Sequence, residues 1–175
     1  VGYFDNNATT PLFPEAREAM LRAMDEHWQN PSGLYHTAGA VRRELELARE
    51  DLAELFGIDE PNRIVFTSGA TESNNIVMRQ SGGPILLSSI EHPCVRESAP
   101  SGSKTVNVDQ RGVVDLAELE RSARQSRPAL ISVMAANNET GVLQPWREIQ
   151  DLSRSLEIPF HCDAAQWIGK LPLEG

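Results

Sequence analysis

Residues 64–75, which read Ile-Val-Phe-Thr-Ser-Gly-Ala-Thr-Glu-Ser-Asn-Asn, constrain the fold of this chain more than any other stretch. The apolar residues 64–66 predict a short buried strand. Ser68 and Gly69 break that run, and the polar residues after them lead into an apolar pattern that predicts a helix. A strand, a glycine turn and a helix start form a site for an anion, because the first helical amides lack partners and carry the positive end of the helix dipole.

This turn alone does not define a function. No Gly-Lys-Ser/Thr follows it, which excludes a Walker A loop, and Gly69 stands alone, which excludes the dinucleotide-binding fingerprint. A strand followed by a helix that Thr71 or Ser73 caps explains the same residues. The neighbouring segments must therefore decide between a phosphate site and an ordinary capped helix.

Strand-like and helix-like segments alternate through most of the chain. This alternation predicts an α/β fold, with a mainly parallel sheet flanked by helices. Lys104 is expected in a loop before a strand. We expect helices over 14–27, 36–56, 94–98, 115–125 and 146–156, and strands over 64–66, 85–87, 105–108, 129–134 and 159–162.

Four polar clusters follow predicted strands. They comprise residues 68–73, Glu91 with His92, residues 137–139, and Asp163 with Gln166. Ligands of parallel sheets bind beyond the carboxyl ends of the strands, so we expect these clusters to line one rim. A planar cationic heterocycle that carries a phosphate would use all four clusters.

Pyridoxal phosphate is such a molecule. Its phosphate would bind the amides of Ala70 and Thr71, and the Asp163 carboxylate would pair with the ring N–H⁺ and keep it protonated. His92 would stack on the ring face. Asn138 or Gln166 would form a hydrogen bond with the ring hydroxyl group.

The same chemistry needs a lysine to bind the cofactor covalently. The chain contains only Lys104 and Lys170. Lys104 is predicted to lie in a loop, and Lys170 is predicted to be a surface residue. Of the two, only Lys170 is a candidate for a chemical role.

Six blocks of the sequence, in order and with matching spacing, resemble the cysteine desulfurases, which are pyridoxal-phosphate enzymes of the class V aminotransferase family. The blocks are residues 3–11, 30–32, 64–75, 91–92, 137–141 and 161–166. The resemblance implies the large domain of a fold-type I pyridoxal-phosphate enzyme. It places residues 14–175 in an incomplete cofactor-binding domain and residues 1–13 in an N-terminal segment near the active site.

The resemblance also implies roles for individual residues. His92 would stack on the cofactor and take part in proton transfer. A substrate-side segment would include Asn7, Ala8 and Thr9. The implied cofactor-binding residues are Ala70, Thr71, His92, Asn138, Asp163 and Gln166.

The implied reaction converts L-cysteine to L-alanine and leaves the sulfur as a persulfide on an enzyme cysteine, for iron–sulfur cluster assembly or thiolation. The resemblance covers only the first half of such an enzyme. In the family, a Ser-x-His-Lys block with the cofactor-binding lysine follows the segment that corresponds to Asp163, and this chain stops before it. We therefore expect this chain alone to be inactive, as a fragment or as one part of a split enzyme. A homodimer and a sulfur-accepting scaffold protein are the implied partners.

Two other readings remain open. A selenocysteine lyase or another class V aminotransferase would share the cofactor site. A non-catalytic module that binds a phosphate metabolite or a partner protein would explain the missing lysine. The presence of Asp163, His92 and Gln166 argues against that module, because a plain phosphate site needs no carboxylate facing its ligand.

Composition limits the partners and the cellular location that this chain can be expected to have. The formal net charge of −9 argues against nucleic acid as a main partner. No apolar stretch reaches transmembrane length, so no membrane partner is expected. Cys94 and Cys162 are too few for a disulfide framework and lack the spacing of metal ligands. A reducing, cytoplasmic location is the expectation, and both cysteines are predicted to be structural.

Overall fold

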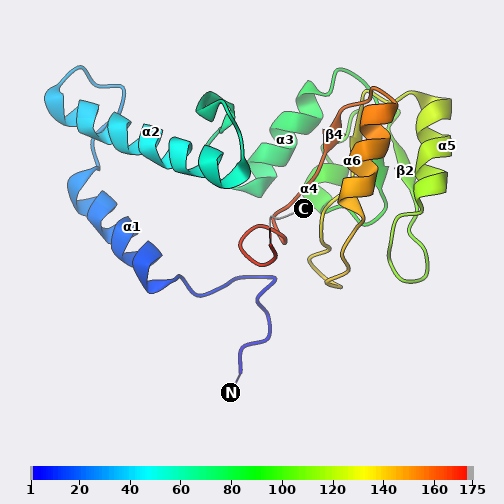
Figure 1. The fold of residues 1–175 in the computed structure, drawn as a ribbon, viewed down its shortest axis with the longest axis horizontal. Helices are drawn as coiled ribbons and strands as arrows, with labels where there is room; N and C mark the ends of the chain where they lie inside the picture. The colour runs from blue at the N-terminus through cyan, green and yellow to red at the C-terminus, as the bar shows by residue number, and fades with distance from the viewer. Residues whose placement is uncertain (1, 173–175) are drawn as a thin grey trace. The chain divides into compact units, whose positions relative to one another are not determined.

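The computed structural model describes residues 2–172, and the chain divides into two compact units between Phe66 and Thr67. The first unit contains helices α1 (Pro14–Glu26) and α2 (His36–Phe56) and the short 3₁₀ helix η1 (Pro61–Arg63) (Figure 1). Both α-helices lie where the apolar periodicity places them. α2 ends at Gly57, whose φ of 63° lies in the left-handed region that terminates helices.

The prediction of a strand over residues 64–66 is wrong. These residues form no regular element, and Val65 and Phe66 are 72% and 45% exposed. Arg49 of α2 contacts this segment. Its Nε donates to the Ile64 carbonyl at 3.0 Å, and its guanidinium lies 5.2 Å from the centre of the Phe66 ring. The local apolar run lacks a neighbouring strand to pair with in the described chain, so it stays irregular.

The second unit confirms the predicted α/β fold. It runs through α3 (Ala70–Gln80), β1 (Ile85–Ser88), α4 (Pro93–Arg96), β2 (Lys104–Val106), α5 (Leu116–Ser126), β3 (Leu130–Ser132), α6 (Trp146–Ser155) and β4 (Phe160–His161). The strands form one sheet in the order β2-β1-β3-β4, and every pair is parallel. Lys104 begins β2, so the prediction of a loop at this position is wrong.

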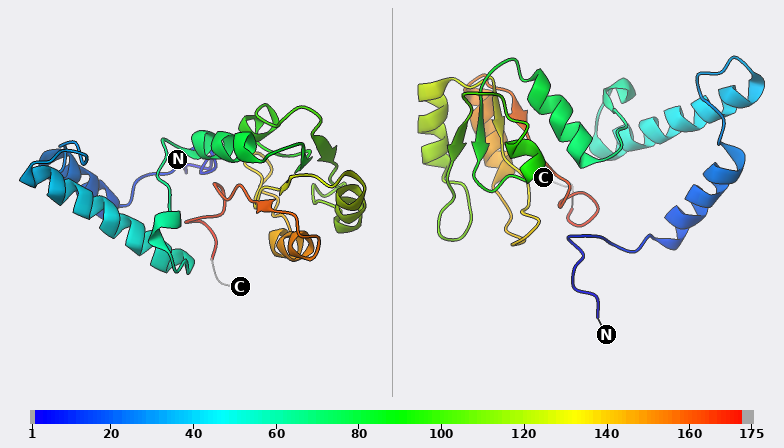
Figure 2. Two further views of the ribbon diagram at one scale, coloured as in Figure 1. Left: turned by 90° about the horizontal axis from the view of Figure 1, so that it is seen from above. Right: turned by 180° about the vertical axis from the view of Figure 1, so that it is seen from behind.

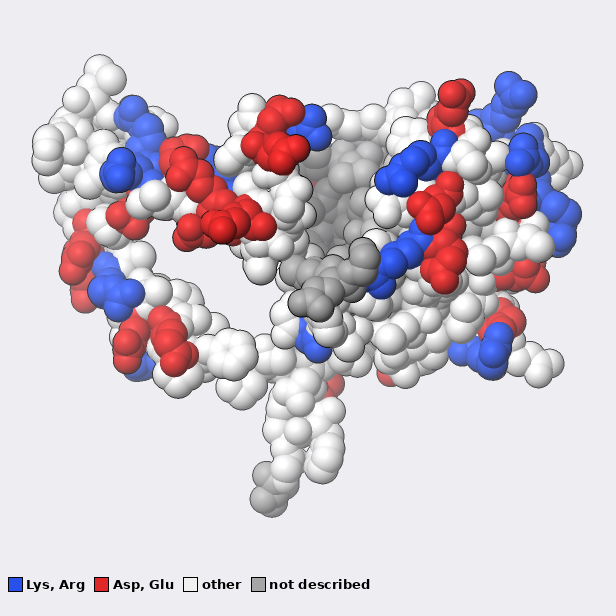
Figure 3. Space-filling model, in the orientation of Figure 1, with Lys and Arg blue, Asp and Glu red and all other residues white. Residues whose placement is uncertain are grey.

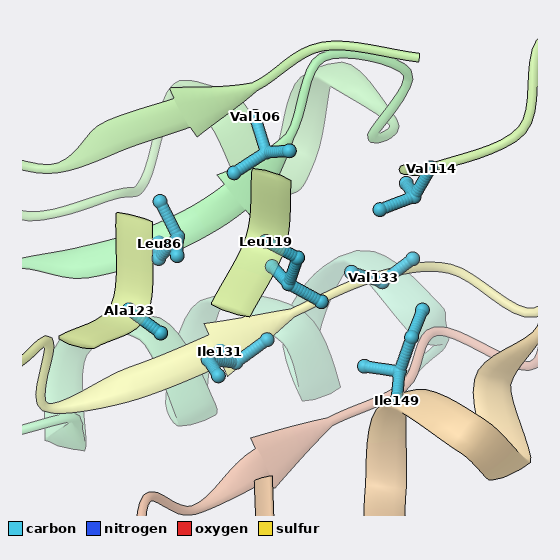
Figure 4. Packing of buried hydrophobic residues seen from close by; sticks show 8 residues of the cluster. All are labelled: Leu86, Val106, Val114, Leu119, Ala123, Ile131, Val133 and Ile149. Carbon is cyan, nitrogen blue, oxygen red and sulfur yellow. The ribbon is translucent and has the colours of Figure 1, made fainter. Parts of the chain in front are cut away.

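Helices cover both faces of this sheet, and Figure 2 shows α3 on one side and α5 with α6 on the other. Alternate residues of β1 divide between the two layers. Ile85 and Leu87 pack with Met78 of α3, whereas Leu86 packs toward α5 and α6. The larger cluster, shown in Figure 4, consists of Leu86, Val106, Val114, Leu119, Ala123, Ile131, Val133 and Ile149.

The outer faces of α5 and α6 carry interspersed acidic and basic side chains (Figure 3). Arg124 pairs with Glu120 at 2.7 Å on α5, and Arg154 pairs with Asp151 at 3.4 Å on α6. These helices are therefore amphipathic, with one apolar face on the sheet and one face in water. Within residues 2–172, no helix has both the length and the apolarity needed to cross a membrane.

The strand order positions the ligand site. The chain moves from β1 outward to β2 and then crosses back to place β3 on the other side of β1. Such a reversal opens a crevice at the carboxyl ends of the two central strands, where ligands of open α/β sheets bind. The loops after β1 and β3 lie at this point.

Candidate functional site

A pocket of about 350 Å³ lies at this end of the sheet, entirely within the second unit. The start of α3, the loops after β1 and β3, and the segment after β4 contribute its walls. The pocket brings together all the residues expected to bind the cofactor. These are Ala70, Thr71, His92, Asn138, Asp163 and Gln166.

The start of α3 forms the anion-binding wall. Gly69 is the N-cap residue and no side chain caps the helix, so the alternative reading of a helix capped by Thr71 or Ser73 is wrong. The Ser73 hydroxyl instead lies 2.8 Å from the Thr67 hydroxyl. The first intrahelical bond here runs from the Ser73 amide to the Gly69 carbonyl. The preceding amides of Ala70 and Thr71 have no carbonyl partner within the helix. Both residues line the pocket.

Glu72 stabilises the turn before the helix. Its Oε2 atom accepts hydrogen bonds from the Ser68 amide at 2.6 Å and from the Ser68 hydroxyl at 2.7 Å. These two bonds lower the pKa of the Glu72 carboxyl, the hydroxyl contributing most. The carboxylate thereby holds the glycine turn in place beside the helix start.

His92 lies at the start of the short helix α4. Its Nδ1 atom accepts a hydrogen bond from the Cys94 amide at 3.2 Å and lies 2.9 Å from the Cys94 sulfur. An Nδ1 that accepts from an amide carries no proton, so the neutral ring is protonated at Nε2. Cys94 thus sets the tautomer of the residue predicted to stack on the cofactor.

Asp163 follows β4, and two donors hold its carboxylate. The Asn74 side-chain amide donates to Oδ2 at 2.8 Å, and the Ala165 backbone amide donates to Oδ1 at 3.0 Å. The backbone is also anchored, because the Asp163 carbonyl accepts a hydrogen bond from the Ala135 amide after β3. The carboxylate therefore has a defined orientation at the edge of the pocket.

Asn137 holds the loop that presents Asn138. Its side-chain oxygen accepts from the amides of Glu139 and Thr140, and its Nδ2 donates to the Ile90 carbonyl at 3.2 Å. This last bond ties the loop after β3 to the loop after β1. Asn138, half-buried beside it, lines the pocket.

The two lysines occupy different positions. Lys104 begins β2, at the end of the strand opposite the pocket. The Lys170 ammonium group donates to the side-chain oxygen of Gln166. Lys170 is exposed, as predicted, and contacts Gln166 of the pocket.

The two cysteines are both free thiols. Burial raises the pKa of the Cys162 thiol to about 12, and the charges of Glu91 and Asp163 add to this effect. A thiol with so high a pKa is a poor nucleophile at neutral pH. The structure thus supports the structural role predicted for Cys162. Cys94 differs, because it lines the pocket.

The substrate-side residues Asn7, Ala8 and Thr9 lie in a turn of the first unit. The amides of Ala8 and Thr9 both donate to the Asp5 carbonyl, at 3.1 and 3.3 Å. Their role on the substrate side remains a prediction.

Sequence reasoning assigned no role to Asn74 or Glu91, although both belong to the motifs quoted above. Asn74 is 4% exposed and Glu91 is 3% exposed. One signal was available for Asn74, since it precedes Met78 by four residues and so shares the buried face of α3. A polar side chain on such a face requires a polar partner. Glu91 offers no such periodicity, because it lies in a loop.

The parallel sheet, the anion-binding helix start and the carboxylate at the sheet edge define the large domain of a pyridoxal-phosphate protein. The model of the family described as aminotransferase class-V matches residues 2–174. The chain belongs to this family, whose members depend on pyridoxal phosphate.

Several curated relatives are named cysteine desulfurase. The chain is 41% identical to the cysteine desulfurase of Homo sapiens, over 98% of this chain and 40% of that protein. It is 40% identical to the cysteine desulfurase IscS of Methanosarcina thermophila, over 98% of this chain and 45% of that protein. The chain therefore spans less than half the length of these curated relatives.

Solved structures of similar proteins agree with the family assignment. A NifS-like protein from Rickettsia africae superposes with a TM-score of 0.88 at 35% identity, over 96% of this chain and 49% of that chain. SspA in complex with cysteine superposes with a TM-score of 0.83 at 31% identity, over 97% of this chain and 52% of that chain. The fold-type I assignment is confirmed by these neighbours.

Proposed function

We propose that the protein to which this chain belongs is a cysteine desulfurase, which converts L-cysteine to L-alanine and transfers the sulfur to an enzyme cysteine. One observation carries the proposal. The pocket assembles all the expected cofactor-binding residues, in a chain that aligns over 98% of its length with proteins named cysteine desulfurase.

The residues of the pocket fit pyridoxal phosphate. The amides of Ala70 and Thr71 would hold the phosphate at the start of α3. Asp163 would accept a hydrogen bond from the pyridinium nitrogen, and the Gln166 amide would donate to the ring oxygen. When bound, the cofactor supplies an electron sink for the bonds of the substrate α-carbon. Asp163 favours that chemistry because a carboxylate stabilises the protonated ring.

His92 would cover the ring and move a proton at Nε2. The Cys94 amide fixes this tautomer by donating to Nδ1. A residue that transfers protons near neutral pH must present one nitrogen to the substrate and have the other held in place. The two contacts with Cys94 meet the second requirement.

Other parts of the proposal concern groups outside this chain. The lysine that binds the cofactor, the sulfur-accepting cysteine and the missing half of the enzyme are proposed to lie in the remainder of a protein of the relatives' length. We further propose a homodimer, a cytoplasmic location and a scaffold protein that receives the sulfur for iron–sulfur cluster assembly. The two free thiols are consistent with a reducing compartment.

The test uses the full-length protein loaded with pyridoxal phosphate. L-Cysteine should yield L-alanine, and L-selenocysteine assayed in parallel distinguishes a selenocysteine lyase. Asp163→Ala should lose the bound cofactor and its visible absorbance, whereas the matched control Asp25→Ala, on the exposed face of α1, should retain both. A loaded wild-type protein that forms no alanine from cysteine would refute the proposed activity.

A further inference from the structure

Asn74 is buried and lies at the centre of a set of part-buried hydrogen bonds that the roles assigned above leave unexplained. Besides Asp163, its Nδ2 atom contacts the Cys94 sulfur at 3.3 Å. Its Oδ1 atom lies 3.1 Å from Nε2 of His161 in β4. The other ring nitrogen of His161, Nδ1, lies 2.9 Å from the hydroxyl of Ser132. Ser132 and His161 face each other across the β3–β4 pair, so the sheet register creates this last contact.

These contacts permit only one direction of donation. A carboxylate only accepts hydrogen bonds, so the Asn74 atom facing Asp163 is the Nδ2 donor. Asn74 Oδ1 therefore accepts, and the neutral His161 ring must donate from Nε2. His161 Nδ1 is then the acceptor for the Ser132 hydroxyl. Burial lowers the pKa of His161, against an opposing effect from the Asp163 charge, which agrees with a neutral ring.

Packing alone does not require an asparagine at this position. The buried face of α3 is completed by Met78, four residues later, and an apolar side chain fills such a face without needing polar partners. Here each polar atom of Asn74 meets a partner. Two of these partners belong to the pocket, because Asp163 and Cys94 both line it and Cys94 contacts His92.

We propose that Asn74 is a positioning residue for the cofactor, which holds the Asp163 carboxylate toward the pyridine nitrogen. The orientation of Asn74 is in turn fixed by His161, and that of His161 by Ser132. The inference rests on the proposed cofactor site. An amide neither releases nor accepts a proton at neutral pH, so the chain orients Asp163 without offering the ring proton a further acceptor. Through Cys94, the same side chain also supports His92.

The test compares Asn74→Leu with wild type in the full-length protein. Leucine branches at Cγ like asparagine and fills similar space, but it lacks the donor. The matched control is Asn75→Leu, the same change one position along α3, where the side chain is only half-buried. Two readouts are taken: the equilibrium affinity for pyridoxal phosphate and the ¹⁵N NMR shift of the ring nitrogen of labelled cofactor.

Asn74→Leu should bind the cofactor roughly tenfold more weakly, as expected for a lost hydrogen bond to a charged group. Its ring-nitrogen shift should move toward that of the unprotonated ring, and the Asn75→Leu values should stay at wild type. A role in packing alone would leave the nitrogen shift unchanged. Wild-type values in Asn74→Leu, or equal losses in both variants, would overturn the proposal.

Circular dichroism shows whether Asn74→Leu folds. If it does not fold, His161→Phe provides a second test of the proposal. This variant removes the donor that holds Asn74 Oδ1 and retains a ring in the same place. Affinity should fall about threefold, with the same direction of nitrogen shift. Unchanged values in a folded His161→Phe would then overturn the proposal. A wild-type protein that fails to bind pyridoxal phosphate would instead refute the cofactor site itself.

Discussion

Glu91 is a buried carboxyl group that joins the ends of two central strands. Its Oε1 atom accepts from the Ser88 hydroxyl at 2.6 Å and from the Met134 amide at 2.7 Å, while Oε2 has no hydrogen-bond partner among the described residues. Burial raises its pKa to about 7, and the charge of Asp163 adds to the rise, against these two hydrogen bonds. A single residue thereby makes the stability of the fold depend on pH.

The sign of this dependence follows from the two pKa values. The carboxyl group has a pKa of 4.5 when unfolded and about 7 when folded, so the unfolded chain ionises first as the pH rises. Glu91 therefore lowers the free energy of unfolding between about pH 4.5 and 7, by about 3 kcal/mol in all. The stabilising contribution of the protonated Glu91 side chain is fully present below about pH 4.5 and is lost above about pH 7.

Glu91→Gln should remove this decline. Urea unfolding of wild type and variant from pH 5 to pH 8 measures the effect, and the free-energy difference between them should change by about 2 to 3 kcal/mol across this range. Glu97→Gln, an exposed change six residues later, is the control and should keep the wild-type slope. Parallel curves for Glu91→Gln and wild type would show that Glu91 does not titrate there.

At the scale of elements, α5 shows how a local signal and a tertiary contact combine. Asp115 caps the helix by accepting from the amides of Ala117 and Glu118 at 2.8 and 3.1 Å. Leu119 and Ala123 then bury one face of the helix against the sheet. The cap defines where the helix begins, and the packing defines which face turns inward.

Asp115→Ala should reduce the free energy of unfolding by about 1 kcal/mol, because two helical amides lose their acceptor. Thermal and chemical unfolding measure the change. Arg121→Ala on the exposed face of the same helix should stay within about 0.5 kcal/mol of wild type. A loss in Arg121→Ala as large as that in Asp115→Ala would contradict the capping explanation.

At the scale of the whole molecule, cofactor binding and folding are linked. The pocket exists only when α3, the loops after β1 and β3, and the segment after β4 are assembled, so the cofactor should bind the folded state alone. Any such ligand stabilises the fold by mass action.

Pyridoxal phosphate at a hundred times its Kd should therefore stabilise the protein by about 2.7 kcal/mol. Differential scanning calorimetry at several cofactor concentrations measures this effect. Pyridoxal, which lacks the phosphate, should produce a smaller shift at the same concentration, because it cannot use the amides at the start of α3. Equal shifts for the two ligands would show that this helix start does not bind the phosphate.

The amino-acid sequence was sufficient to predict the parallel α/β class, the position of most elements and the set of residues that lie together in the pocket. These features depend on local patterns: apolar runs, helical periodicity, and polar groups placed directly after strands. Three features became evident only from the three-dimensional packing: residues 64–66 form no strand, Glu91 is buried, and Asn74 contacts Asp163. Asn74 and Asp163 are 89 residues apart, so the strand order and helix packing bring them together, and no local pattern encodes that contact.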